Sequence, residues 1–400
     1  MRGAFLIGVL ALAAASFAVP AAAQQQSCRA GVSFGSWLDG FKRSAAAQGI
    51  SQSTIEAALG NVSFDPSVVQ KDRGQGVFSQ SFLQFSDRMV AQYRLQQGAA
   101  QIKKHRATFQ RIEQQFGVPA EVIVAFWGLE TDFGANTGDM PTIRSLATLA
   151  YDCRRPEMFE RELLAALQLI ERGDLSAQEM RGPWAGELGQ LQFLPVHYMA
   201  HAVDFDGDGR RNLIKSAPDA LASAGKYIQE LGWQRGQPWL QEVKVPANLP
   251  WEQASIAIKL PRAQWAQWGV TAANGNRLPS DNLPASLLLP MGRSGPAFLA
   301  YPNFGIYTQW NNSLVYATTA AYFATRLAGA PKVGRGSGAE ALSLGQIKEL
   351  QQLLVRRGHH VGKVDGILGE NTREAVKNEQ LRLGLPADSY PTSELISRLR

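Results

Sequence analysis

Helical patterning dominates the chain from residue 30 to residue 328. In four segments, apolar residues recur at every third or fourth position, which places them on one face of a helix. These expected helices cover residues 33–49, 82–117, 158–173 and 217–233. Ser53 and Glu56 have the spacing of a capping box and predict the start of a further helix. We therefore expect this region to form one mainly helical unit.

Residues 239–290 depart from that pattern. Three short β-prone stretches, bounded by Pro, Gly and Asn, lie at 239–246, 254–261 and 285–292. They predict a small sheet inserted into the helical unit. The expected fold of residues 30–328 is therefore a mainly α, α+β domain.

The last part of the chain predicts a separate module. Residues 329–341 are rich in Gly, Ala and Ser without periodicity, which is typical of a linker. Residues 342–400 contain three amphipathic segments, and Leu350, Leu353 and Leu354 form an apolar stripe on the first. We expect a three-helix module of a size at which independent folding is feasible.

The N-terminus has the pattern of an export signal. Arg2 precedes the apolar stretch 5–19, and a small-residue site follows it. This order predicts a signal peptide over residues 1–23, cut after Ala23, although an uncleaved anchor stays open. No second stretch is long and apolar enough to span a membrane. We therefore expect a periplasmic or otherwise exported, soluble protein.

The composition excludes few classes of binding partner. The net charge is +6, which would suit nucleic acid, an anionic membrane surface or an acidic polymer. Basic residues form no block and do not alternate with aromatic ones, which disfavours nucleic acid. Nothing in the sequence demands more than a monomer.

The chain has two cysteines, Cys28 and Cys153. In an oxidising compartment they can pair and tie the N-terminal segment to the main domain, whereas two free buried thiols are the alternative. One cysteine pair cannot build a Cys-rich zinc site, and the five histidines have no HExxH spacing.

Glu130 interrupts an apolar stripe. A helix starting near Pro119 would place Val122, Phe126 and Glu130 on one face. Burial there disfavours the charged carboxylate and raises its pKa, and a carboxylic acid that is still protonated near neutral pH can serve as a general acid. The alternative is a glutamate whose tip reaches solvent. Asp132, two residues on, would point elsewhere and is expected to be structural.

Five motifs surround this glutamate and carry a resemblance. They are WGLETDFG, LAYDCRRPEMF, RGPWAGELGQLQFLPVHY, DFDGDGRRNL and YTQWNNSLVYA. In this order they resemble the lytic murein transglycosylase B family, which cleaves peptidoglycan with a lysozyme-like core, over residues 30–328. The tail, with VDGILGENT, resembles the three-helix peptidoglycan-binding module of wall hydrolases.

The resemblance implies a reaction without water or a required cofactor. Glu130 would protonate the glycosidic oxygen between MurNAc and GlcNAc. It would then take the proton of the MurNAc 6-hydroxyl as this oxygen attacks the anomeric carbon and forms a 1,6-anhydro sugar. Ordinary glycosidases use two carboxylates. A hydrolase of the same bond and a non-catalytic wall-binding scaffold remain the alternatives.

The resemblance also implies how glycan strands and stem peptides are bound. Gln192 and Asn311 match groove amides that can bond neutral sugars. Three aromatic residues of this chain match aromatic positions that line the groove in the family: Trp310, Tyr316 and Tyr227. The alternative is that each is an ordinary core residue. In the same way, Arg154 and Arg155 match an arginine pair of the family that could bind acidic stem peptides. The alternative is that they are a solvated pair on the surface.

Three residues in the third motif depart from the family. Pro183 stands where some members have a serine, so the role of that hydroxyl is in doubt here. Glu187 and Leu188 stand where Ala-Met is usual. We expect Glu187 to lie near the groove, without assigning it a catalytic role.

The fourth motif resembles a calcium loop. Asp204, Asp206 and Asp208 occupy the first three ligand positions of an EF-hand-like sequence, but Lys215 stands where a bidentate acid belongs. Asp219 could replace it. A weakly bound structural Ca²⁺ and a metal-free turn both remain open.

Overall fold

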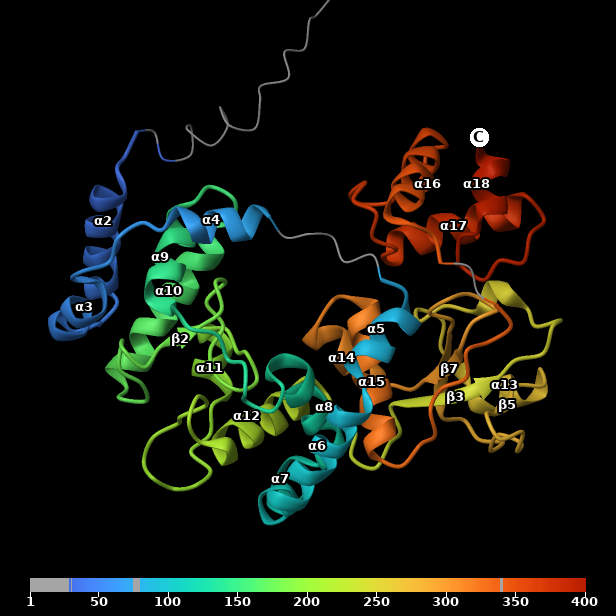
Figure 1. Cartoon of the computed structure of the whole chain (residues 1–400), viewed down its shortest axis with the longest axis horizontal. Helices are drawn as coiled ribbons and strands as arrows, with labels where there is room; N and C mark the ends of the chain where they lie inside the picture. The colour runs from blue at the N-terminus through green and yellow to red at the C-terminus, as the bar shows by residue number, and fades with distance from the viewer. Residues whose placement is uncertain (1–28, 30, 75–79, 339–340) are drawn as a thin grey trace, which may run out of the picture.

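The computed structural model describes residues 29, 31–74, 80–338 and 341–400, which form helices together with a five-stranded sheet and a two-stranded sheet (Figure 1). The helices before the sheet are α2 (Phe34–Ala47), α3 (Gln52–Leu59), α4 (Pro66–Arg73), α5 (Phe82–Met89), α6 (Gln92–Lys104), α7 (Arg106–Phe116), α8 (Ala120–Thr131), α9 (Thr142–Tyr151), α10 (Pro156–Glu171), α11 (Pro195–His201) and α12 (Ala217–Glu230). The mainly helical fold is confirmed. Within the described residues, no helix combines the length and apolarity needed to cross a membrane. The predicted signal peptide lies outside them.

Helix α8 is the centre of the helical part. Its side chains from Val122 to Trp127 are buried, and α6, α7, α12 and α15 (Leu314–Leu327) pack around it (Figure 1). The helix ends at Asp132, whose left-handed backbone (φ 52°) turns the chain. Glu130 is thereby placed one residue before the last residue of this helix, Thr131.

Two details of the expected helices are wrong. The segment 82–117 is three helices, because the chain turns at Val90 and at His105. These turns let α6 and α7 both contact α8, which one straight helix could not do. Helix α3 is capped by Ser51, whose hydroxyl accepts from the Thr54 amide, and not by Ser53.

The predicted sheet is present as five antiparallel strands in the order β4-β6-β7-β3-β5. Their bounds are β3 (Leu240–Lys244), β4 (Leu260–Pro261), β5 (Thr271–Ala272), β6 (Pro284–Leu288) and β7 (Ala297–Ala300). The stretch 254–261 is a strand only at its end. The central strand β7 was not predicted, because all four of its side chains are buried and give no alternation. A 3₁₀ turn (Trp251–Gln253) and α13 (Arg262–Gln267) complete this subdomain, whose own core includes Trp251 and Trp265.

The C-terminal module has the three predicted helices, α16 (Leu344–Arg356), α17 (Glu370–Arg382) and α18 (Ser393–Leu399). Leu350, Leu353 and Leu354 lie in its core. The module lies beside the sheet (Figure 1), where Arg373 donates to the carbonyls of Leu289 (3.3 Å) and Pro290 (2.9 Å).

Residues 329–338, part of the predicted linker, have neither helix nor strand, yet they are held to the main domain. Asp87 on α5 forms ion pairs with Lys332 (3.2 Å) and Arg335 (2.8 Å). Val333 is buried, and its amide donates to the Tyr322 hydroxyl. This part of the segment fixes the position of the chain that leads to the module.

Candidate active site

A cleft of about 420 Å³ contains Glu130. Four parts of the fold line it: the end of α8, the segment 183–194, helices α11 and α12, and the end of α14 (Phe304–Trp310). The lining residues are Glu130, Pro183, Trp184, Ala185, Glu187, Leu191, Gln192, Phe193, Leu194, His197, Tyr227, Gln309, Trp310 and Asn311. The structure thus brings together residues from three of the five motifs, and Tyr227 from outside them.

Short-range backbone constraints shape the segment 183–194. Strand β1 (Met140–Pro141) pairs with β2 (Arg181–Gly182), and Leu188 bridges to Phe193. A Cβ at Gly182 would lie 2.0 Å from the Glu187 carbonyl oxygen, so only glycine fits there. The loop is therefore held closely against the strand that precedes it.

Two side chains donate hydrogen bonds to Glu130. The Trp310 indole donates to its Oε1 at 3.0 Å, and the Tyr316 hydroxyl donates to the same oxygen. Burial raises the pKa of Glu130, while the hydrogen bonds from Tyr316 and Trp310 oppose that rise. The site therefore favours a protonated Glu130 and also provides donors that stabilise its carboxylate once the proton has left.

The junction between α14 and α15 positions these donors. Trp310 ends α14 and stacks on Phe126 of α8, with ring centroids 4.2 Å apart. Asn311 accepts from the Ser313 amide (2.9 Å), and Ser313 caps α15 by accepting from the Tyr316 amide. One short turn thus fixes Trp310, Asn311 and Tyr316 relative to Glu130.

Gln192 has an unusual backbone for a residue other than glycine, with φ 54°. Its side-chain amide donates to the carbonyls of Gly189 (2.8 Å) and Thr137 (3.3 Å), which hold this conformation. Thr131 donates to the Gln190 carbonyl (2.6 Å) and joins this segment to the end of α8. Strained backbone that is held by its surroundings is typical of functional sites.

Three of the predicted substrate-binding residues do not line the cleft. Tyr316 lies behind it as a donor to Glu130. Arg154 and Arg155 instead form ion pairs with Asp72, at 2.7 and 2.6 Å. Asp132 pairs with Arg94 at 3.0 Å, in agreement with its expected structural role.

Several lining residues were not predicted, namely Trp184, His197 and Gln309. Trp184 and His197 occur in the same motif as Gln192, so their position in that motif was the available signal. Their approach to Glu130 depends on how the segment folds back on α8. Gln309 carried no separate signal.

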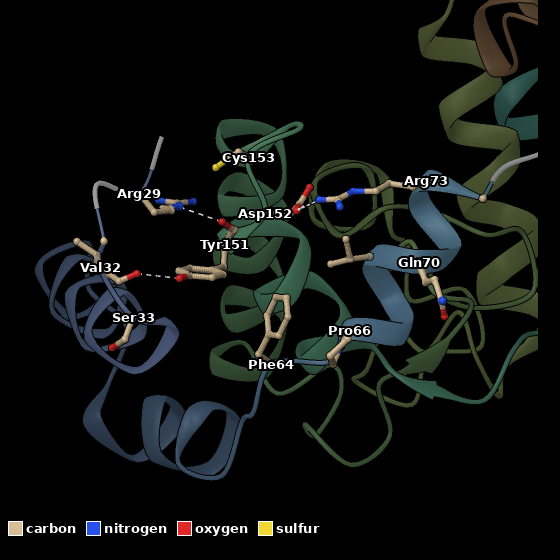
Figure 2. A pocket seen from close by; sticks show the side chains of 13 residues that line it. Arg29, Val32, Ser33, Phe64, Pro66, Gln70, Arg73, Tyr151, Asp152 and Cys153 are labelled. Atoms are coloured by element: carbon tan, nitrogen blue, oxygen red, sulfur yellow. Dashed lines mark hydrogen bonds and ion pairs between the residues drawn. The ribbon is translucent and has the colours of Figure 1, made fainter. Parts of the chain in front are cut away.

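A larger pocket of about 940 Å³ lies next to Cys153, between α4, the end of α9 and the N-terminal segment (Figure 2). Arg73 pairs with Asp152 at 2.7 Å, and the Tyr151 hydroxyl donates to the Val32 carbonyl. Cys153 is disulfide-bonded. Its predicted partner, Cys28, lies outside the described residues, so the pairing stays a prediction.

The calcium-like loop gathers a different acid set from the one its spacing predicts. Carboxylate oxygens of Asp204, Asp206 and Asp219 lie within 4.8 Å of one another, and Asp208 is not in this group. Lys215 turns away to pair with Glu179 at 2.8 Å. Asp219 is buried and accepts from the amides of Phe205 and Asn212. The three carboxylates fit a hard cation that takes oxygen ligands.

Comparison with known proteins identifies two families, one for each folded part of the chain. Residues 33–325 match the family described as "Transglycosylase SLT domain", and residues 343–399 match a peptidoglycan binding domain. The membrane-bound lytic murein transglycosylase B of Escherichia coli (strain K12) is 32% identical over 243 residues, which cover 59% of this chain and 64% of that protein. The match thus spans less than two thirds of that relative.

Two solved structures resemble the fold. SltB3 from Pseudomonas aeruginosa, in complex with NAG-anhNAM-pentapeptide, is 42% identical with a TM-score of 0.87, over 92% of this chain and 100% of that one. The Escherichia coli lytic transglycosylase Slt35, in complex with calcium, is 28% identical with a TM-score of 0.63, over 73% of this chain and 92% of that one.

Proposed function

The chain belongs to the SLT transglycosylase family, and from this premise we propose that it cleaves the β-1,4 bond between MurNAc and GlcNAc in peptidoglycan without water. The observation that carries the proposal is the half-buried Glu130 in the cleft with its two donors. The product would be a glycan strand that ends in 1,6-anhydroMurNAc.

Glu130 performs both proton transfers in this proposal. Its raised pKa keeps the proton that it gives to the glycosidic oxygen as the bond from that oxygen to the anomeric carbon breaks. Trp310 and Tyr316 then stabilise the carboxylate. The carboxylate next accepts the proton of the MurNAc 6-hydroxyl, whose oxygen bonds to the anomeric carbon. Glu130 thus ends the reaction protonated, as it began it, and no water is consumed.

The other cleft residues suit a neutral sugar chain. Gln192 and Asn311 offer amide groups, and Tyr227 offers an aromatic face and a hydroxyl. Arg154 and Arg155 lie outside the lining and share Asp72, but 45% and 37% of their side chains are exposed. We assign them to acidic stem peptides at the margin of the bound strand.

We further propose an exported protein whose C-terminal module attaches it to the wall. Docking of the module against the sheet supports this arrangement, since binding by the module would then orient the cleft. The group of Asp204, Asp206 and Asp219 would hold a structural calcium ion, and no step of the reaction passes through it.

The second candidate is a hydrolase, because Glu187 provides a second carboxyl in the cleft. Mass spectrometry of muropeptides released from purified sacculi separates the two reactions. Anhydro-muropeptides from the wild type and none from Glu130→Gln would support transglycosylation through Glu130. Products heavier by one water would refute it in favour of hydrolysis. Sacculus binding without release from either protein would favour a scaffold.

A further inference from the structure

A second acidic side chain lines the cleft, and no step above uses it. Glu187 follows β2 and directly precedes the bridge between Leu188 and Phe193. The close approach of its carbonyl oxygen to Gly182 fixes its backbone. The fold therefore fixes the backbone position from which this side chain reaches the cleft.

The two cleft carboxyls differ in their hydrogen bonds. Glu130 accepts from Trp310 and Tyr316, whereas Oε2 of Glu187 is buried and has no hydrogen-bond partner among the described residues. Donors stabilise a carboxylate, and a buried oxygen without donors favours the neutral acid. The donors therefore favour the carboxylate form of Glu130, whereas the missing donor at Oε2 favours the neutral form of Glu187.

The surroundings of Glu187 also favour its neutral form, because they raise the pKa of its carboxyl. Burial raises its pKa, and the charges of Glu130 and Glu162 raise it further, while a bond from its own amide and the charge of Arg155 lower it. His197, on the neighbouring helix α11, has a pKa lowered by burial and adds no positive charge near neutral pH. Arg155 is already engaged by Asp72.

With the proposed function as its basis, we propose that Glu187 is a substrate-binding residue: as a neutral carboxylic acid with its proton on Oε1, because Oε2 is enclosed, it donates its O–H to a carbonyl or hydroxyl oxygen of the glycan bound beside Glu130. A neutral carboxyl offers one donor together with acceptor capacity, which suits acetamido and hydroxyl groups. It also avoids a second negative charge at the stage where Glu130 has given up its proton.

Glycan binding in an inactive background tests this role. The probe is a soluble GlcNAc–MurNAc tetrasaccharide, titrated calorimetrically into Glu130→Gln between about pH 4.5 and pH 8, a range that spans a raised carboxyl pKa. We expect the affinity to fall as pH rises, because Glu187 ionises and loses its donor. The double variant E130Q/E187Q should lose this part of the pH dependence, since an amide donates at every pH. In E130Q/E187L the affinity at the lowest pH should fall about tenfold, the equivalent of one neutral hydrogen bond.

Glu162→Gln in the same background is the matched control. Glu162 is also a buried carboxyl, but it already accepts from the Val196 amide (2.9 Å) and does not line the cleft. This variant should keep the loss of affinity with rising pH, displaced to lower pH because the charge of Glu162 helps to raise the pKa of Glu187. Any contribution from His197 is common to all variants. Equal pH dependence with and without Glu187, or undiminished binding by E130Q/E187L, would overturn the proposal. If E130Q/E187L does not fold, E130Q/E187Q still decides it.

None of these proteins needs to turn over substrate. A failure of the proposed transglycosylation would appear as a hydrolytic product, or no product, from the wild type. It would leave these binding curves unchanged, so the two failures can be told apart.

Discussion

Removal of the Tyr316 hydroxyl tests whether the fold controls the proton on Glu130. In Tyr316→Phe, Glu130 keeps its burial and the Trp310 donor but loses one hydrogen bond to Oε1. A hydrogen bond to a charged group contributes about 1.5–3 kcal/mol. Because Trp310 still donates to the same oxygen, we use the lower end. About 1.4 kcal/mol corresponds to one pH unit, so the alkaline limb of kcat/KM should move upward by about one unit.

The direction follows from the role of Glu130. As the general acid it must be protonated in the free enzyme, so the alkaline limb reports its ionisation. Loss of a donor to the carboxylate disfavours ionisation and moves this limb to higher pH. The assay is release of soluble muropeptides from sacculi, followed across pH.

Tyr307→Phe is the matched control. Tyr307 stacks on Phe126 at 5.0 Å and is buried, but its hydroxyl has no hydrogen-bond partner among the described residues. Its removal should leave the alkaline limb in place. An unchanged or downward-shifted limb in Tyr316→Phe would refute the assignment of the general acid, as would an equal shift in Tyr307→Phe.

Three further predictions follow from the described contacts. Burial raises the pKa of Glu130 in the folded protein, so the stability of the wild type falls as pH rises from the ordinary carboxyl range through that raised pKa. Glu130→Gln should therefore have a higher Tm than the wild type at about pH 8 and not at about pH 4. The reverse pattern would contradict this prediction. Excess calcium should raise the Tm of the wild type but not of Asp204→Ser, and an equal rise in both would exclude this loop as the site. Arg373→Met removes the contacts with Leu289 and Pro290, so the radius of gyration from X-ray scattering should increase through release of the C-terminal module, and an unchanged radius would mean that other contacts suffice.

Periodicity was a sound guide where a helix has one buried face. The helices around 34–47, 156–171 and 217–230 agree with the predicted segments within a few residues. It failed where the chain had to turn without a strong local signal. Neither Val90 nor His105 is a glycine or proline, and the breaks there depend on the packing of α6 and α7 against α8.

The buried carboxylate was predictable because its chemistry conflicts with its position. Glu130 stands on an apolar face, and such a conflict is visible in sequence alone. The donors that tune it were only partly predictable. Trp310 and Tyr316 were expected as groove aromatics, whereas their hydrogen bonds to Glu130 join residues 180 and 186 positions apart.

The acid set of the calcium-like loop shows the same limit. Its spacing predicted Asp204, Asp206 and Asp208 as metal ligands, with Asp219 as a possible replacement for the missing acid at Lys215. The loop turns so that Asp219, at the start of α12, joins the first two acids, and Asp208 remains outside. Ligand spacing describes one loop, whereas the site also uses the helix that follows it.

The sequence by itself determined the helical class, the inserted sheet, the three-helix tail and the glutamate that the chemistry requires, because each of these depends on neighbouring residues or on a motif. Only the tertiary structure decided which side chains reach Glu130, that the arginine pair is engaged by Asp72, and that Glu187 is a second acid in the cleft whose Oε2 has no donor. The physical reason is that burial and hydrogen bonding at the cleft are set by segments far apart in the chain, and no local pattern records how they meet.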